Sequence, residues 1–181
     1  MAGTSRPGLA APDGVISLPV GAAVRRPGVL LVDDRPANLL ALEGLLGPLE
    51  ARTVQASSGE EALARLAADE FALVVLDVQM PALDGLETLA RLRERERGPK
   101  TPVLFVTAGG ADPARVARAY QLGAVDFIAK PLDPDALRAK VAVFLELYEA
   151  REEVRRHAAV LRARDLADSE RKYRFLADAT P

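Results

Sequence analysis

Hydrophobic residues in the central part of this chain fall into five short runs that alternate with longer mixed segments. Each run is too short for a typical helix, and the runs lie at Val29–Val32, Arg52–Ala56, Phe71–Leu76, Val103–Val106 and Val125–Ala129. Near-continuous apolar runs of this length are typical of strands that are buried on both faces of a parallel sheet. The run at Arg52–Ala56 is the weakest of them.

The segments between these runs carry signals for the start and end of helices. Four N-cap residues, each with the Glu or Pro that strengthens the signal, are Ser58 with Glu61, Asp84 with Glu87, Asp112 with Pro113 and Asp133 with Pro134. Gly98 and Gly123 are predicted helix stops. Five strands and five helices in strict alternation predict a doubly wound α/β fold, in which right-handed crossovers place helices on both faces of the sheet.

Composition agrees with a globular protein and excludes several classes of site. Of the 181 residues, 49% are hydrophobic and 28% are charged. The formal net charge is −2, so no global field favours nucleic acid or an anionic membrane. The chain has no cysteine, which excludes disulfides and thiolate sites and is consistent with the cytoplasm. No apolar run reaches the ~18 residues of a membrane span, so none is expected.

The two ends of the chain differ from its centre. Residues 1–27 contain closely spaced proline and glycine, which predicts a flexible arm. Residues 135–180 contain neither, so the last helix is predicted to continue for ~70 Å at the standard rise. The part at 149–181 is richly charged, and Val154, Ala158 and Leu161 have heptad-like spacing. This spacing favours a linker helix or coiled coil, with a solvated helix as the alternative.

Polar residues stand at the ends of four predicted strands. They are Asp33 and Asp34, then Asp77, Thr107 and Lys130. Because ligands bind outside the carboxyl ends of the strands in an open parallel sheet, we expect these side chains at one rim. Clustered carboxylates need a cation, and oxygen ligands favour Mg²⁺. A carboxylate beside Mg²⁺ and a lysine is suited to attack on phosphorus, with the Thr107 hydroxyl donating to a phosphoryl oxygen afterwards.

The motifs VLLVDD, LDVQMPALDG, VLFVTA and FIAKP together resemble the receiver domain of two-component response regulators. The resemblance covers residues 28–148 and implies a flavodoxin-like sheet with strand order 2-1-3-4-5. It implies a signalling module that receives a phosphoryl group from a histidine kinase or a phosphotransfer protein. Such a domain catalyses only its own phosphorylation and dephosphorylation.

The resemblance also implies a role for individual residues around a bound Mg²⁺. Asp77 matches the phosphoacceptor and is also a metal ligand. Asp34 matches a direct ligand and Asp33 a water-mediated one. Gln79 matches the position whose backbone carbonyl binds the metal.

Other matched residues imply a switch. Lys130 matches the lysine that pairs with the phosphoryl group, and the family usually has a cis peptide at the bond to Pro131. Thr107 matches the hydroxyl that moves toward the phosphoryl group, and Phe127 the aromatic residue that then rotates. We expect this change to alter the face formed by the fourth helix, fifth strand and fifth helix, and so the orientation or dimerisation of the C-terminal helix.

The last residues, Ser169–Pro181, resemble the opening helix of a PAS sensory domain, which implies a hybrid sensor kinase with an N-terminal receiver. An amphipathic end that packs on a partner is the alternative. His157 is the only histidine, and its surroundings, VRRHAAVL, do not resemble a kinase motif. We therefore expect the phosphoryl group to come from another protein or from a small phosphodonor.

The sequence disfavours four other functions. A haloacid-dehalogenase-type phosphatase is disfavoured because that family typically has a second Asp two residues after its nucleophile, where this chain has Gln79 after Asp77 and Arg35 after Asp33. A flavin carrier would need a hydroxyl- or glycine-rich phosphate loop after the first strand and is disfavoured because the DDRPANLL segment there is acidic. A P-loop nucleotide hydrolase is disfavoured because no G-x-x-x-x-G-K-S/T motif is present. A scaffold without phosphotransfer is disfavoured by the intact acceptor set. No DNA-binding signature is present.

Overall fold

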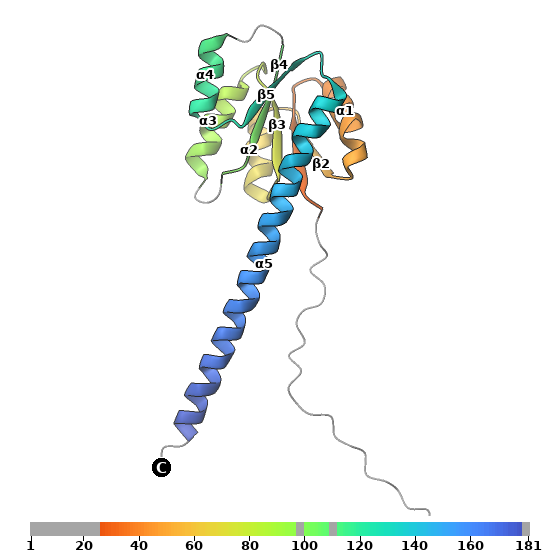
Figure 1. Cartoon of the computed structure of the whole chain (residues 1–181). Coiled ribbons are helices and arrows are strands. Elements are labelled where there is room, and N and C mark those ends of the chain that lie inside the picture. The colour runs from red at the N-terminus through yellow and green to blue at the C-terminus, as the bar shows by residue number, and fades with distance from the viewer. Residues whose placement is uncertain (1–25, 97–99, 109–111, 179–181) are drawn as a thin grey trace, which may run out of the picture.

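The central sheet has the predicted topology. The computed structural model of the chain describes residues 26–96, 100–108 and 112–178 (Figure 1). Its five strands are all parallel in the order β2-β1-β3-β4-β5. They are β1 (Gly28–Val32), β2 (Arg52–Ala56), β3 (Leu73–Asp77), β4 (Val103–Ala108) and β5 (Asp126–Lys130). The fold class and the strand order expected from the resemblance are therefore confirmed.

Helices cover both faces of this sheet, because successive side chains of each strand point to opposite sides. The helices are α1 (Pro36–Leu46), α2 (Gly59–Ala68), α3 (Gly85–Arg95), α4 (Pro113–Gln121) and α5 (Pro134–Asp178), and a 3-10 turn, η1 (Gly47–Leu49), follows α1. Leu30 and Val32 of β1 pack in the core under α2, α3 and α4. Val29 and Leu31 pack in the opposite core with α1 and the first turns of α5.

The predicted N-caps are present, with one correction. Four helices begin at a side chain that accepts a backbone N–H, namely Ser58 from Glu61, Asp84 from Glu87, Asp112 from Ala114 and Asp133 from Asp135. The reciprocal half of the capping box at Ser58 is wrong, because the Glu61 carboxylate accepts from the backbone and hydroxyl of Ser57 instead. Glu61 therefore fixes the turn one residue before the cap.

The predicted ends of elements are correct to within one or two residues. β3 begins at Leu73, two residues after the predicted start, and includes Asp77 as its last residue. Lys130 is likewise the last residue of β5. Gly123 follows α4 with a φ of +84°, a conformation that favours glycine. Gly98 lies outside the described residues, as does nearly all of the predicted arm at 1–27.

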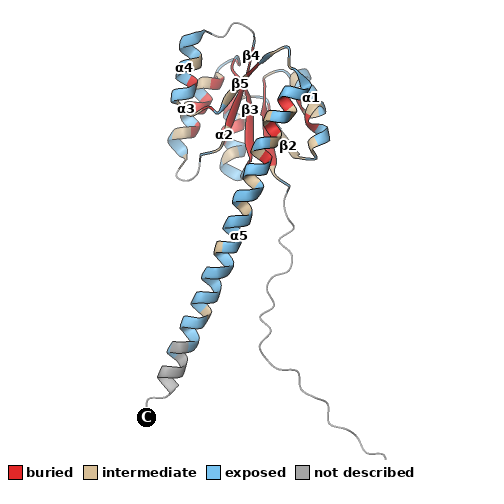
Figure 2. Ribbon diagram, viewed as in Figure 1, coloured by how far each residue is buried: buried red, intermediate tan, exposed pale blue. Residues whose placement is uncertain are grey.

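The last helix, α5, is 45 residues long. Its first part is buried through Leu137, Val141 and Leu145, whereas the part after Tyr148 is mainly exposed (Figure 2). The exposed part contacts the body of the domain where Arg155 lies 3.3 Å from Glu70. Among the described helices, none combines the length and the apolar character needed to cross a bilayer.

Candidate functional site

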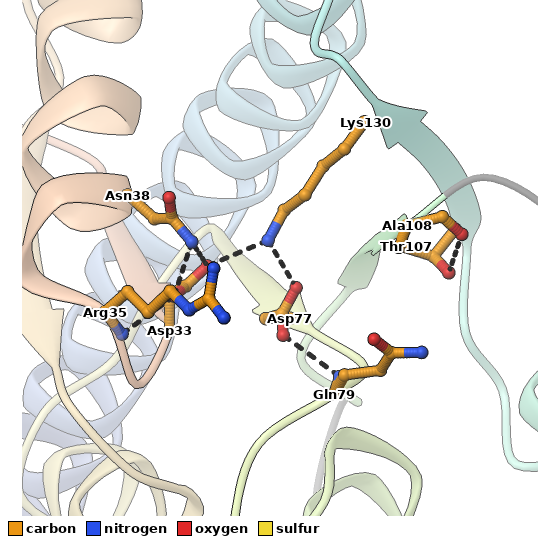
Figure 3. A network of polar contacts seen from close by, with 8 residues as sticks. All are labelled: Asp33, Arg35, Asn38, Asp77, Gln79, Thr107, Ala108 and Lys130. Atoms are coloured by element: carbon orange, nitrogen blue, oxygen red, sulfur yellow. Dashed lines mark hydrogen bonds and ion pairs between the residues drawn. The ribbon is translucent and has the colours of Figure 1, made fainter.

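Asp77 lies at the carboxyl end of the central strand β3, and only 5% of its surface is exposed. One carboxylate oxygen, Oδ1, accepts a 2.7 Å hydrogen bond from the Lys130 ammonium (Figure 3). The other, Oδ2, accepts a 3.0 Å bond from the backbone N–H of Gln79. A lysine from the end of β5 and the turn after β3 therefore fix both oxygens of the predicted phosphoacceptor.

Asp33 follows β1, the neighbour of β3, and is 1% exposed. Its Oδ1 accepts from the backbone N–H of Arg35 and from the Asn38 side-chain amide, both at 2.9 Å. Its Oδ2 accepts from the same amide at 2.9 Å and from Lys130 at 3.1 Å. Two buried carboxylates from adjacent strands thus share one ammonium group.

Lys130 reaches this position from the end of β5, and its side chain is 31% exposed. The peptide bond from Lys130 to Pro131 is cis, as the resemblance led us to expect. Burial lowers the pKa of Lys130, but the hydrogen bonds to Asp77 and Asp33 oppose this and hold the pKa above its ordinary value. The ammonium group is therefore a fixed positive charge at neutral pH.

Burial raises the pKa of Asp77 above its ordinary value, and the nearby charge of Asp33 adds to the rise. The hydrogen bonds from Lys130 and from Gln79 only partly offset this effect. A buried carboxylate in this state gains from an additional positive charge.

The oxygen donors at the rim fit a hard divalent cation. Asp34 is half-buried and makes no hydrogen bond or ion pair with the part of the chain that the structure describes. In the same described part, no three Asp, Glu, His or Cys side chains are gathered tightly enough to form a complete metal cage. The carboxylates that could hold such a cation are those of Asp77 and Asp34, with water completing its shell, which is usual for Mg²⁺.

The two predicted switch residues have partners other than the carboxylates. Thr107 is 7% exposed, and its hydroxyl donates to the carbonyl of Ala108 at 3.0 Å. Phe127 is half-buried in the core under α4. Its ring stacks on Phe105 and meets the edge of Tyr120, with centroid distances of 5.3 Å in both cases.

One residue of the site was missed from the sequence. Asn38 lies in the first turn of α1 and binds both oxygens of Asp33. The only signal was a short amide side chain close behind the Asp33-Asp34 pair, at the start of a helix.

Comparison with known proteins decides the family. The response regulator receiver domain matches residues 29–142, which is more than half of the chain. The chain belongs to the response regulator receiver family. The match covers the five strands except Gly28 at the start of β1, and it includes Asp33, Asp77 and Lys130.

Receivers with different partner domains resemble this one. RpfG of Xanthomonas campestris pv. campestris, a cyclic di-GMP phosphodiesterase response regulator, is 32% identical over 141 residues, which are 77% of this chain and 37% of RpfG. The sensor histidine kinase GacS of Pseudomonas protegens is 38% identical over 112 residues, which are 60% of this chain and 12% of GacS. The chain thus spans well under half the length of either relative.

Solved receivers share the fold. The signal receiver domain of an HD domain-containing protein from Pseudomonas fluorescens Pf-5 superposes with a TM-score of 0.64 and 31% identity, covering 75% of this chain and 98% of that one. The receiver domain of a signal transduction histidine kinase from Syntrophus aciditrophicus superposes with a TM-score of 0.60 and 30% identity, covering 66% of this chain and 90% of that one.

Proposed function

We propose that this receiver accepts a phosphoryl group on Asp77 from a phosphohistidine of a histidine kinase or phosphotransfer protein, in a Mg²⁺-dependent reaction. The observation that carries the proposal is the Lys130 ammonium, 2.7 Å from Asp77 and 3.1 Å from Asp33 at the carboxyl edge of the sheet. This arrangement places a buried carboxylate beside a fixed positive charge.

In the proposed reaction, a carboxylate oxygen of Asp77 attacks the phosphorus of the donor. A new O–P bond forms, the N–P bond of the phosphohistidine breaks, and its electron pair returns to the imidazole nitrogen. Lys130 moves its hydrogen bond from the Asp77 carboxylate to the phosphoryl oxygens. A Mg²⁺ held by Asp34, Asp77 and the Gln79 carbonyl would supply further charge neutralisation, with Asp33 acting through a water molecule.

The proposed switch starts at Thr107. A phosphoryl group adds about −1.5 to −2 charges at this rim, which attracts a hydroxyl donor. The Thr107 hydroxyl then leaves the Ala108 carbonyl, to which it donates at 3.0 Å, and turns toward the phosphoryl group. The vacated space allows Phe127 to turn inward, away from its edge contact with Tyr120 on α4. The change then alters the surface formed by α4, β5 and α5.

The output is proposed to be a protein surface or a covalently linked domain, reached through α5. The relatives include both a phosphodiesterase response regulator and a sensor kinase, so the receiver occurs with several kinds of partner domain. A hybrid-kinase context for the segment 169–181, a homodimer through the helical segment 149–181 and a cytoplasmic location are parts of this proposal that rest on the sequence alone.

The test is to incubate the whole chain with Mg²⁺ and acetyl phosphate and to record its intact mass. We expect one phosphoryl adduct, which is lost without Mg²⁺ and in the Asp77→Asn variant. An adduct that persists in Asp77→Asn would place the acceptor elsewhere. No adduct from acetyl phosphate or from a panel of histidine kinases would favour a docking module without phosphotransfer.

A further inference from the structure

The hydrogen bonds of Asp33 leave this carboxylate little capacity for another partner. An ionised carboxylate has about four lone-pair positions. Asp33 already accepts four contacts of 2.9 to 3.1 Å, from Arg35, Asn38 and Lys130. Asp34, the adjacent residue, makes none with the described part of the chain. The Asp33 carboxylate thus has little room for another hydrogen-bond donor or a metal ion, whereas the Asp34 carboxylate has room for both.

Asn38 provides two of these four contacts from a firmly placed position. Pro36 occupies the start of α1, where its fixed φ suits the helix. Arg35 precedes it as the N-cap but makes no side-chain capping bond. Asp33 instead accepts the Arg35 N–H at 2.9 Å, which anchors the carboxylate at the N-terminus of the helix. Asn38, half-buried in the same turn, then holds the carboxylate at both oxygens.

We propose that Asn38 is a positioning residue for phosphoryl transfer. It holds Asp33 in the orientation that shares Lys130 with Asp77 and that keeps Asp33 out of direct contact with the metal ion. This inference rests on the proposed function, because it concerns the same site. In this arrangement, Asp34 binds the metal ion directly and Asp33 holds the Lys130 ammonium in place.

Loss of the Asn38 amide has two opposed effects in this geometry. A buried carboxylate that loses a donor is left under-solvated, and a cation then compensates for the loss. Asp33 therefore turns toward the metal and attracts it more strongly. The same carboxylate also attracts Lys130 more strongly, at the expense of the 2.7 Å contact with Asp77. The expected signature is tighter metal binding together with slower phosphorylation.

Asn38→Leu tests this, since leucine has a similar branched shape, is a good helix former and cannot donate a hydrogen bond. We expect calorimetric titration of the whole chain with Mg²⁺ to show binding about three- to tenfold tighter than in the wild type. The rate of phosphorylation by acetyl phosphate at saturating Mg²⁺ should fall by a similar factor. Leu40→Ala, on an exposed position of the same helix, should change neither quantity.

A double-mutant cycle with Asp33→Asn shows whether Asn38 acts through Asp33. If it does, Asn38→Leu in the Asp33→Asn background shifts neither the Mg²⁺ affinity nor the urea midpoint further. Unchanged Mg²⁺ binding in Asn38→Leu overturns the proposal. Weaker Mg²⁺ binding and slower phosphorylation, accompanied by a lower urea midpoint, also overturn it. The proposal is also overturned if the shifts in urea midpoint of Asn38→Leu and Asp33→Asn add up in the double variant.

These outcomes are separate from those of the proposed function. A wild-type chain without any adduct, either from acetyl phosphate or from a panel of histidine kinases, refutes phosphotransfer, while the Mg²⁺ titration and the metal-free urea cycle still decide the role of Asn38. A wild-type chain that binds no Mg²⁺ overturns the metal part of the proposal.

Discussion

Arg115 of α4 lies 2.9 Å from Asp84, the residue that caps α3. The two oxygens of Asp84 have different partners, because Oδ1 accepts from the backbone N–H of Glu87 and Oδ2 from the Arg115 guanidinium. The turn that follows Asp77 is thereby tied to the first turn of α4, the helix next to Phe127.

We expect Asp84→Ala to destabilise the domain more than Arg115→Ala. The ion pair is 44% and 38% exposed, so its loss should lower the free energy of unfolding by less than about 1 kcal/mol. Loss of Asp84 removes the cap as well and should cost about 1–2 kcal/mol. Urea unfolding measures the stability of both variants, and the double variant should have the same free energy of unfolding as Asp84→Ala.

Asp112→Ala is the matched control for this pair, since Asp112 caps α4 itself and does not bind Arg115. Its effect should add to that of Arg115→Ala. Additivity between Arg115→Ala and Asp84→Ala would show that the two side chains do not interact in solution.

Arg93 should be the most costly surface arginine to remove. It is 10% exposed, donates at 3.0 Å to the carbonyls of Leu122 and Gly123, and pairs with Glu96. Arg93→Ala removes the donors of these part-buried carbonyls and leaves the Glu96 carboxylate only its bond from the Thr101 N–H, so we expect a loss of about 3 kcal/mol in unfolding free energy. Arg93→Lys should restore little of this stability, because one ammonium group cannot replace the planar guanidinium with its several N–H donors.

Arg91→Ala provides the control for Arg93. Its guanidinium pairs with Glu87 one turn earlier on the exposed side of α3, and such pairs contribute about 0.3–0.5 kcal/mol. Equal losses in the two alanine variants would contradict the role given to Arg93 in joining α3 to the turn before β5.

Asp126 should contribute to stability at neutral pH and lose this contribution in acid. Partial burial raises its pKa, but hydrogen bonds from Lys140 and from the Phe127 N–H outweigh this and keep the pKa below its ordinary value. The unfolded carboxyl titrates at about 4, so the contribution is complete above that pH and disappears as the pH falls through the lower folded value.

The corresponding measurement is urea unfolding of wild type and Asp126→Asn between neutral pH and pH values well below the ordinary Asp pKa. We expect the wild type to be more stable by less than about 1 kcal/mol at neutral pH, since both side chains are more than one-third exposed. The difference should vanish in acid. A difference that grows toward low pH would reverse the assigned direction.

The exposed part of α5 should mediate self-association if the coiled-coil prediction is right. Leu147, Val154 and Leu161 follow one another at seven-residue intervals and are 59%, 68% and 61% exposed. Replacing all three with glutamine should shift sedimentation toward the monomer without affecting the fold of the receiver.

The control for this triple variant is a pair of substitutions on other sides of the helix. Val160 and Leu166 are 55% and 65% exposed and lie off the seven-residue row, so their replacement with glutamine should leave association unchanged. A wild-type chain that stays monomeric at all concentrations would support the solvated helix instead.

The topology and part of the site could be predicted from the sequence because they depend on local patterns. Each buried strand is an apolar run, and each run ends close to the polar residue that the parallel sheet brings to the rim. This reasoning placed Asp77, Asp33 and Lys130 together, and the structure links them through one ammonium group. The weak run at Arg52–Ala56 was also correctly predicted as a strand, and the structure places it at the edge of the sheet.

The remaining contacts depend on side-chain directions and on residues far apart in the chain. The role of Asn38 follows from the rotation of α1 over Asp33, which no pattern of apolar residues specifies. Arg93 binds carbonyl groups about thirty positions away, and the Glu61 carboxylate accepts from Ser57, the residue before the cap. Thr107 turns to Ala108, a choice of rotamer that the sequence leaves open.

The length of α5 determines how far a small movement in the domain would be transmitted. About 30 residues separate Tyr148 from Asp178, a distance of about 45 Å along the helix axis. A tilt of about 10° where the helix leaves the domain would displace its far end by about 8 Å, more than one helical turn. A tilt of this size would make the helix a lever, which converts a small rotation at the domain into a displacement large enough to separate or align two protein surfaces.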